Sequence, residues 1–180
     1  MENPIASRMC TLVILITLTT SVGQAMQEGT KEEKLKPSKL PPAVAQAIKT
    51  NCTNCSIGKA TREIENGVTV YDIEFKSGQG EIAVAENGSV IDRETVISIN
   101  DVPAAALEAI QKAAANGKVK QVVKGEIRAE LRDGQIVKLT SPRYVYEAEL
   151  VKGNQRAEVE VTPDGKVIEA PDWKKGKRDN

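Results

Sequence analysis

Val145-Tyr-Glu-Ala-Glu-Leu150 and Ala157-Glu-Val-Glu-Val161 decide the fold, and Gly153-Asn154 lies between them. Apolar and acidic residues alternate in both stretches, which is typical of a strand with one buried face. A turn at Gly153-Asn154 joins the two stretches as an antiparallel hairpin. The register of this hairpin predicts two opposed pairs on its outer face: Glu147 with Glu160, and Glu149 with Glu158.

The first of these stretches has an earlier counterpart, Val70-Tyr-Asp-Ile-Glu-Phe75. Two more blocks recur in the same order along the chain: residues 40–48 match 102–110, and residues 87–92 match 164–169. Three matched blocks in one order indicate an internal duplication. We therefore expect two repeats, over residues 40–100 and 101–173.

Each repeat is expected to begin with a helix, because Pro41 and Pro103 suit a first helical turn. The helices are predicted over residues 42–50 and 104–115, and strands follow each of them. A turn at Gly78-Gln79 would place Phe75 opposite Ile82. The sequence thus predicts an α+β fold, a tandem duplication in which each copy is one helix packed on an antiparallel β-meander sheet.

These blocks resemble the PepSY and PepSY-like superfamily over residues 40–173. The family's Leu-Pro or Val-Pro helix start is matched by Leu40-Pro41 and Val102-Pro103. Its Tyr-x-Val-x-Val strand is matched by residues 71–75 and 146–150, and its glycine turn with a hydrophobic pair by residues 88–91 and 165–168.

The tandem arrangement is similar to the β-lactamase-inhibitor-like members of that superfamily. The resemblance implies a non-catalytic extracytoplasmic domain that binds or inhibits an exported hydrolase. The chain departs from the family at Cys52-Thr-Asn-Cys55, and again at the long segment 117–143 before the second tyrosine strand.

The composition narrows the possible functions. The chain has 180 residues, no histidine, and 25 Lys+Arg against 25 Asp+Glu. The absence of histidine removes imidazole-based catalysis and imidazole zinc sites. Zero net charge argues against nucleic-acid binding, which requires a basic surface. We therefore expect neither an enzyme nor a bound cofactor or metal.

The N-terminus has the order of a secretory signal: a short charged segment, an apolar run, and small residues before a cleavage site. We predict a signal peptide over residues 1–25, cleaved after Ala25, and a secreted or periplasmic protein without a membrane span after cleavage. Residues 26–39 carry many charges and are predicted to be a disordered tether. Residues 174–180 form a basic tail.

Cys52 and Cys55 end the first predicted helix. In an oxidising compartment they are expected to form a local disulfide. Zinc is disfavoured because the mature chain has no third cysteine and no histidine. The alternative is a thiol–disulfide or envelope-stress protein that uses this pair, although a redox-active pair is typically found at a helix N-terminus.

The candidate binding surface for a protein partner consists of Glu147, Glu149, Glu158, Glu160 and Trp173. Trp173 is either a cap on the core edge or an exposed anchor. The alternative for the acids is a lattice of ion pairs with Lys120, Lys124, Arg128 and Arg132. A hydrolase with paired carboxylates is disfavoured because these acids alternate along open strands. An architectural envelope module is the remaining alternative to a binder.

Overall fold

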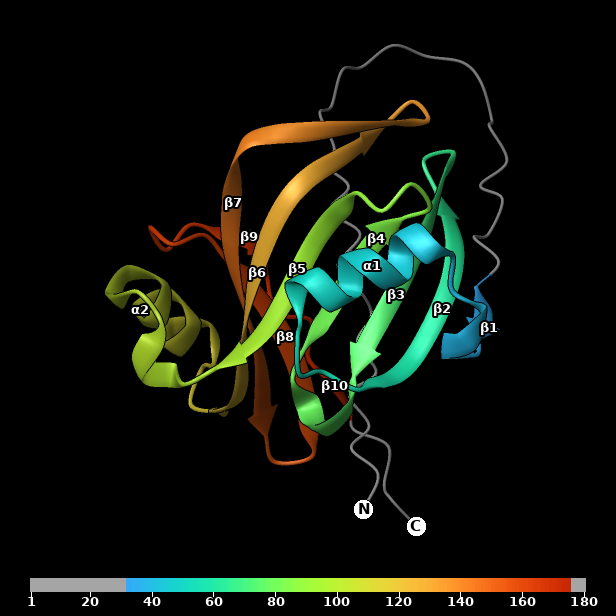
Figure 1. Cartoon of the computed structure of the whole chain (residues 1–180). Coiled ribbons are helices and arrows are strands. Elements are labelled where there is room, and N and C mark those ends of the chain that lie inside the picture. The colour runs from blue at the N-terminus through green and yellow to red at the C-terminus, as the bar shows by residue number, and fades with distance from the viewer. Residues whose placement is uncertain (1–31, 176–180) are drawn as a thin grey trace, which may run out of the picture.

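The computed structural model describes residues 32–175, which form one antiparallel sheet of ten strands with two short α-helices (Figure 1). The helices are α1 (Pro42–Asn51) and α2 (Ala104–Ala113). The strands are β1 (Glu33–Leu35), β2 (Ile57–Glu65), β3 (Val68–Phe75), β4 (Glu81–Ala85), β5 (Val90–Ile97), β6 (Lys118–Arg132), β7 (Gln135–Lys152), β8 (Gln155–Val161), β9 (Val167–Glu169) and β10 (Lys174–Lys175).

The strands follow one another as a meander. From β1 to β8 each strand pairs with the next in the sequence, and both β9 and β10 pair with β8. Two-residue turns such as Asn66-Gly67, Asp133-Gly134 and Gly153-Asn154 permit this, because a residue with a positive φ matches the twist of a tight hairpin.

The predicted α+β fold, with each copy as a helix on its own sheet, is wrong. The fold is mostly antiparallel strand, and β5 pairs with β6 from Asp92 opposite Ile127 to Ile97 opposite Val122. This pairing joins the strands of both repeats into one sheet. The reason is that β6, which follows α2 as β2 follows α1, pairs with β5 as well as with β7. It thereby satisfies the backbone groups that β5 would otherwise leave at an open edge.

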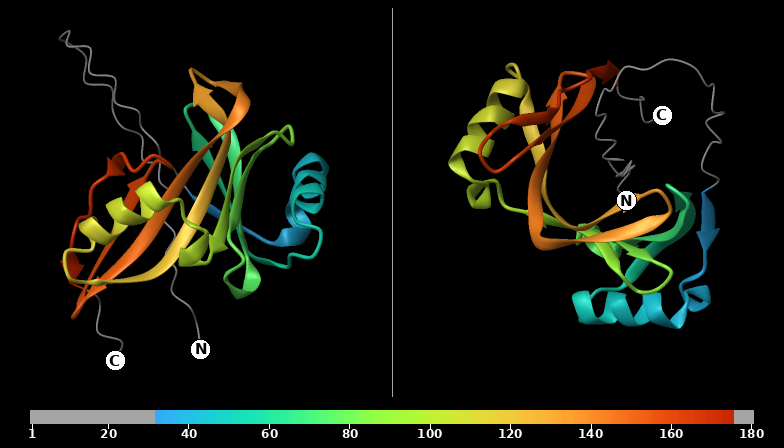
Figure 2. Two further views of the ribbon diagram at one scale, coloured as in Figure 1. Left: turned by 90° about the vertical axis from the view of Figure 1, so that its left-hand side faces the viewer. Right: turned by 90° about the horizontal axis from the view of Figure 1, so that it is seen from above.

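Both helices lie on the outer, convex side of the bent sheet (Figure 2). Val44 and Ile48 of α1 belong to a buried cluster with the inward residues of β3 and β4. Ala106 and Ile110 of α2 belong to a second cluster with the inward residues of β7 and β8. Tyr71 (4% exposed) and Tyr146 (6% exposed) occupy matching positions in these clusters.

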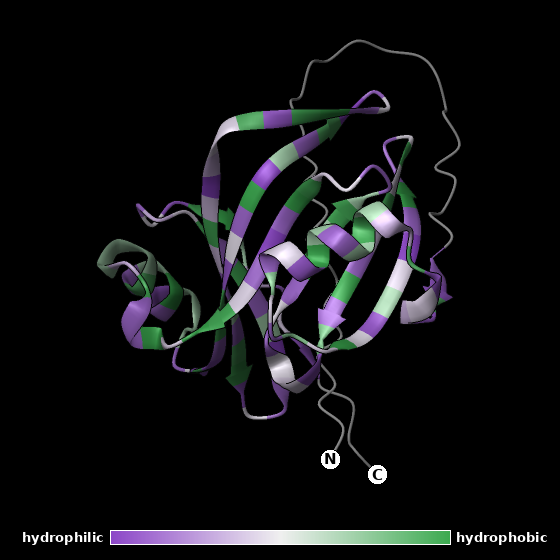
Figure 3. Ribbon diagram, in the orientation of Figure 1, coloured by the Kyte–Doolittle hydropathy of each residue, from purple (hydrophilic) through white to green (hydrophobic). Residues whose placement is uncertain are grey.

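A third buried cluster lies on the opposite side of the sheet. There the far end of the β6–β7 ribbon packs Ala129, Leu131 and Ile136 against apolar residues of β3 and β4. The ribbon is fixed at its tip, where the Gly134 amide donates to the Asn66 carbonyl oxygen at 2.8 Å. The alternation of hydrophobic and hydrophilic residues along the strands is visible in Figure 3.

Two local expectations also need correction. Glu33–Leu35, within the predicted disordered tether, pairs with β2 as a strand, and Leu35 packs against the first cluster. Ile82 lies opposite Ile73 and not Phe75, because the β3–β4 connection runs from Lys76 to Gly80 and is longer than the expected turn.

The predicted signal peptide, residues 26–31 of the tether and residues 176–180 of the tail lie outside the described residues. Within residues 32–175, neither helix is both long and apolar enough to cross a membrane.

Candidate functional site

The face of the sheet that carries no helix is crowded with carboxylates, and we call it the acidic face. The strand register places these side chains on one face, because residues two apart in a strand and directly opposed residues share a side. Its members are Glu63, Glu65, Asp72, Glu74, Glu81, Asp92, Glu94, Glu147, Glu149, Glu158, Glu160 and Glu169.

Many of these acids are directly opposed. Glu81 of β4 lies between Glu74 and Glu94, and Glu160 of β8 lies between Glu147 and Glu169. Glu149 lies opposite Glu158, as predicted. Like charges directly opposite one another destabilise a sheet. The arrangement therefore has a cost in folding free energy that a purely structural surface would avoid.

The matching blocks of the two repeats carry acids at equivalent positions. Asp72 corresponds to Glu147, Glu74 to Glu149, and Asp92 to Glu169. The acidic face is thus a feature of both repeats, and the continuous sheet merges the two acidic surfaces into one.

The centre of this face holds carboxyl groups with high pKa values. Burial, followed by the nearby charge of Glu147, raises the pKa of Glu94 to about 8. Burial and the charges of Glu158 and Glu160 raise the pKa of Glu147 to about 7. Both groups therefore gain or lose protons close to neutral pH.

A second group of acids lies towards the β6–β7 ribbon. Burial and a hydrogen bond with Glu63 raise the pKa of Asp72 to about 9, and burial raises that of Glu65 to about 7. Burial, with the charge of Glu81, raises the pKa of Asp92 to about 7. The Asp72 Oδ1 atom is buried without a hydrogen-bond partner among the described residues.

Only part of the predicted ion lattice forms. Lys120 reaches Glu149 at 2.9 Å, and Arg156 reaches the same carboxylate at 2.7 Å. The other three predicted cations have different contacts: Lys124 lies over the Tyr144 ring, Arg128 pairs with Glu126, and Arg132 pairs with Glu130.

Glu130 shows how a nearby cation changes the pKa of a carboxyl group in this protein. The hydrogen bond from Arg143 lowers the pKa of Glu130 below its usual range. Glu94 and Glu147, whose pKa values are raised, make none of the ion pairs formed within residues 32–175. Glu94 and Glu147 therefore lack the ion pair that lowers the pKa of Glu130.

The five residues predicted as a binding surface do not form one patch. The four glutamates lie together on β7 and β8, and Glu160 is only 4% exposed. Trp173 packs against the second apolar cluster, with Lys152 6.0 Å from its ring centre. Because that cluster lies on the helix-bearing face, Trp173 lies at the edge of the core and apart from the acids.

Sequence reasoning missed the acids of the first repeat, above all Asp72, Asp92 and Glu94. The signal that could have identified them was present in the matched blocks, since Asp72 occupies the position of Glu147. Without the β5–β6 pairing, nothing indicated that the acids of the two repeats share a face.

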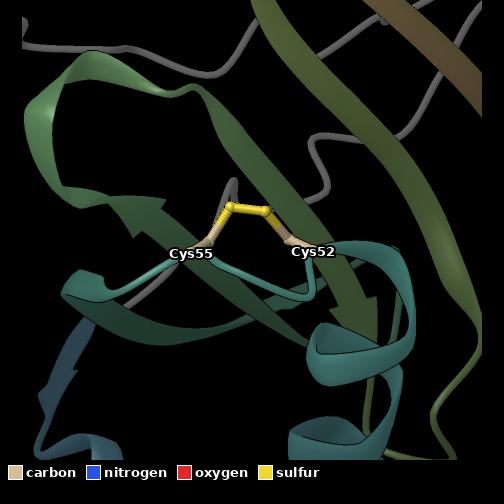
Figure 4. Close-up of a disulfide and its surroundings, with 2 residues drawn as sticks. All are labelled: Cys52 and Cys55. Carbon is tan, nitrogen blue, oxygen red and sulfur yellow. A yellow bond between two sulfur atoms is a disulfide. The ribbon is translucent and has the colours of Figure 1, made fainter.

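The two cysteines form the expected disulfide, which closes the loop after α1 with a Cα–Cα distance of 5.4 Å (Figure 4). The Cys52 amide donates to the Ile48 carbonyl oxygen at 2.8 Å, so the bridge follows the C-terminal end of the helix. Both cysteines pack against the first apolar cluster. Within the described part of the chain, no three cysteine or acidic side chains are placed to hold a metal ion.

These observations define a class of β-sheet protein with helices on one face and carboxyl groups gathered on the opposite face. A family model described as "Putative beta-lactamase-inhibitor-like, PepSY-like" matches residues 22–92 and again 90–169. The chain belongs to this PepSY-like family, as its sequence resemblance indicated. No curated protein matches it significantly.

Several solved structures are similar to this chain. A "putative periplasmic" protein from Bacteroides eggerthii is 15% identical, with 77% of this chain and 92% of that chain covered and a TM-score of 0.51. A protein of a family of unknown function from Bacteroides uniformis is 17% identical, with 72% and 87% covered and a TM-score of 0.50. A BLIP-like protein from Bacteroides fragilis is 21% identical, with 78% and 91% covered and a TM-score of 0.47. At these identities the likeness to the first two structures concerns the fold alone.

Proposed function

We propose that this protein is a non-catalytic extracytoplasmic domain that binds a cationic surface on a protein partner through its acidic face. The observation that carries the proposal is the row Glu147–Glu160–Glu169, in which like charges oppose one another across three strands. Such a row lowers the stability of the sheet. Groups kept in a costly arrangement are found most often at functional sites.

The chemistry of the face favours recognition over catalysis. A paired-carboxylate hydrolase needs two acids in a cleft with separated pKa values, one as acid and one as base or nucleophile. Glu94 and Glu147 both have raised pKa values, about 8 and about 7, so neither has the low pKa of an ionised nucleophile. A cationic partner, in contrast, would stabilise the ionised form of every group on the face.

Family membership supports an exported hydrolase as the partner class, and inhibition or regulation of that hydrolase as the outcome of binding. The signal-like N-terminus supports an extracytoplasmic location, where such enzymes act.

The test is a capture experiment with the mature chain, residues 26–180, on the secreted or periplasmic protein fraction. Three baits are compared: wild type, the variant Glu147→Gln/Glu158→Gln, and the control Glu33→Gln/Glu108→Gln, whose exposed acids lie on β1 and α2. Wild type and control should retain the same basic proteins, and the acidic-face variant should lose them. Equal retention by all three baits would contradict the proposal.

A second arm addresses catalysis. The purified mature chain should show no hydrolase turnover on peptide, ester or glycoside substrates. Turnover that disappears in Glu147→Gln or Glu149→Gln would assign the face to an enzyme and overturn the proposal.

A further inference from the structure

A groove on the helix-bearing side of the sheet is lined by positive charge, in contrast to the acidic face. It lies between the β4–β5 turn and the bent part of the β6–β7 ribbon and has a volume of about 500 Å³. Two cations, Arg128 and Lys138, line it together with polar and apolar residues, and no carboxylate does. Its volume falls within the range typical of small-molecule sites, roughly 300–1,000 Å³.

Arg128 is held in one orientation by two elements. Its Nε donates to Glu126 at 2.8 Å, and its Nη1 donates to the Oδ1 of Asn51 in α1 at 2.6 Å. Asn51 is itself fixed, because its side-chain amide donates to the Ala47 carbonyl oxygen at 2.8 Å. The Nη2 group of Arg128 makes none of the hydrogen bonds formed among the described side chains, so an oriented donor remains available.

The β6–β7 wall of the groove contains a large irregularity in strand pairing. Ile127 lies opposite Arg143 and Ala129 opposite Lys138, so residues 139–142 of β7 face only Arg128. Such bulges re-aim side chains and are frequent beside functional sites. Pro142 ends the bulge, where its missing N–H leaves no donor unpaired.

The remaining walls supply hydrogen bonding and apolar contact. The Asn87 Oδ1 accepts from the Ser89 amide at 2.9 Å, which leaves the Asn87 side-chain amide as a donor. Leu139 and Pro142 add apolar surface. Lys138 makes no ion pair with any residue that the structure describes, and it is exposed.

We propose that this groove binds an organic carboxylate next to a short apolar group, with the carboxylate between Arg128 and Lys138 and the apolar group on Leu139 and Pro142. The planar guanidinium suits two-point contact with a carboxylate. Two sources share this chemistry, a small carboxylic acid and the free C-terminus of a polypeptide. The site is independent of the acidic face.

The test is an NMR titration of the ¹⁵N-labelled mature chain with four probes: 4-methylpentanoate, acetyl-alanyl-leucine, and the carboxamide of each. The two carboxylates should shift the amide signals of residues 87–89 and 138–141, and each should bind about tenfold more tightly than its carboxamide. Equal affinity for carboxylate and carboxamide, or shifts confined to other residues, would overturn the proposal.

Substitutions test whether Lys138 contributes to carboxylate binding. Lys138→Gln should weaken carboxylate binding about tenfold, equivalent to about 1.4 kcal/mol, and leave the melting temperature unchanged because Lys138 is exposed. The control Lys112→Gln, which removes an exposed cation from α2, should bind as wild type does. Unchanged affinity in Lys138→Gln would contradict the assignment. Tighter binding of acetyl-alanyl-leucine than of 4-methylpentanoate would identify a polypeptide C-terminus as the source, and equal binding a small acid.

Discussion

The two faces of this sheet differ in the side chains that they bring together. On the helix-bearing face, Ile73, Ile82, Leu150 and Val159 are fully buried among apolar neighbours. On the acidic face, Glu81 and Glu160 each lie between two further glutamates. Burial of apolar side chains stabilises the first face, whereas charge crowding costs stability on the second. The comparison shows that one alternating strand pattern can build an apolar core on one face of a sheet and gather carboxyl groups on the other.

The largest expected effect is on the helix-bearing face. Leu150→Ala removes a side chain with no exposed surface from the second cluster and should lower the free energy of unfolding by about 2–5 kcal/mol. Urea denaturation measures the change. Val167→Ala, at a β9 position that is 43% exposed, is the matched control and should change stability by less than about 0.5 kcal/mol. Similar losses of unfolding free energy in the two variants would show that α2 does not cover a packed core.

The disulfide is the second largest contribution on that face. Cys52→Ala/Cys55→Ala should lower the free energy of unfolding by roughly 2 kcal/mol, because the bridge closes only a short loop. Thermal and urea unfolding of the oxidised wild type and the variant give the difference.

The reduction potential of the Cys52–Cys55 bridge distinguishes a structural role from thiol–disulfide exchange. A reduction potential below about −300 mV is expected of a structural bridge. A potential near that of disulfide-exchange enzymes, about −200 mV or higher, would support the alternative that the pair takes part in thiol–disulfide exchange.

The acidic face should make stability fall as pH rises. The folded-state pKa values of Glu94 and Asp72, about 8 and about 9, exceed the ordinary values of 4.5 and 3.8 for these side chains. The folded chain thus holds protons that the unfolded chain releases, and its stability decreases from about pH 5 to about pH 9. Urea unfolding at pH 5, 7 and 9 tests this expectation. A stability that is constant or rises over this range would show that these carboxyl groups are not crowded.

Sequence reasoning succeeded where contacts are local. The Gly153-Asn154 turn fixes the β7–β8 register, so Glu147 and Glu149 were correctly placed opposite Glu160 and Glu158. The β3–β4 register was wrong, because Ser77 and Gly78 both take positive φ in a longer connection that the glycine pattern did not reveal.

The single sheet could not be predicted because it depends on a long-range pairing. β5 ends the first repeat and pairs with β6, after an intervening helix, and no local pattern indicates which strands will meet. The groove lined by Arg128 and Lys138 was missed for the same reason, since Arg128 binds Asn51 and lines a groove with residues 87–90 only in the folded chain.

The most direct test of the central claim, that ionised carboxylates crowded on the acidic face cost stability, is the free energy of unfolding of Glu94→Gln/Glu147→Gln at pH 8. Glu94 lies on β5 and Glu147 on β7, with β6 between them, and the charge of Glu147 contributes to the raised pKa of Glu94. The variant is expected to be more stable than wild type by about 1–2 kcal/mol. A variant that is equally stable or less stable would contradict the claim.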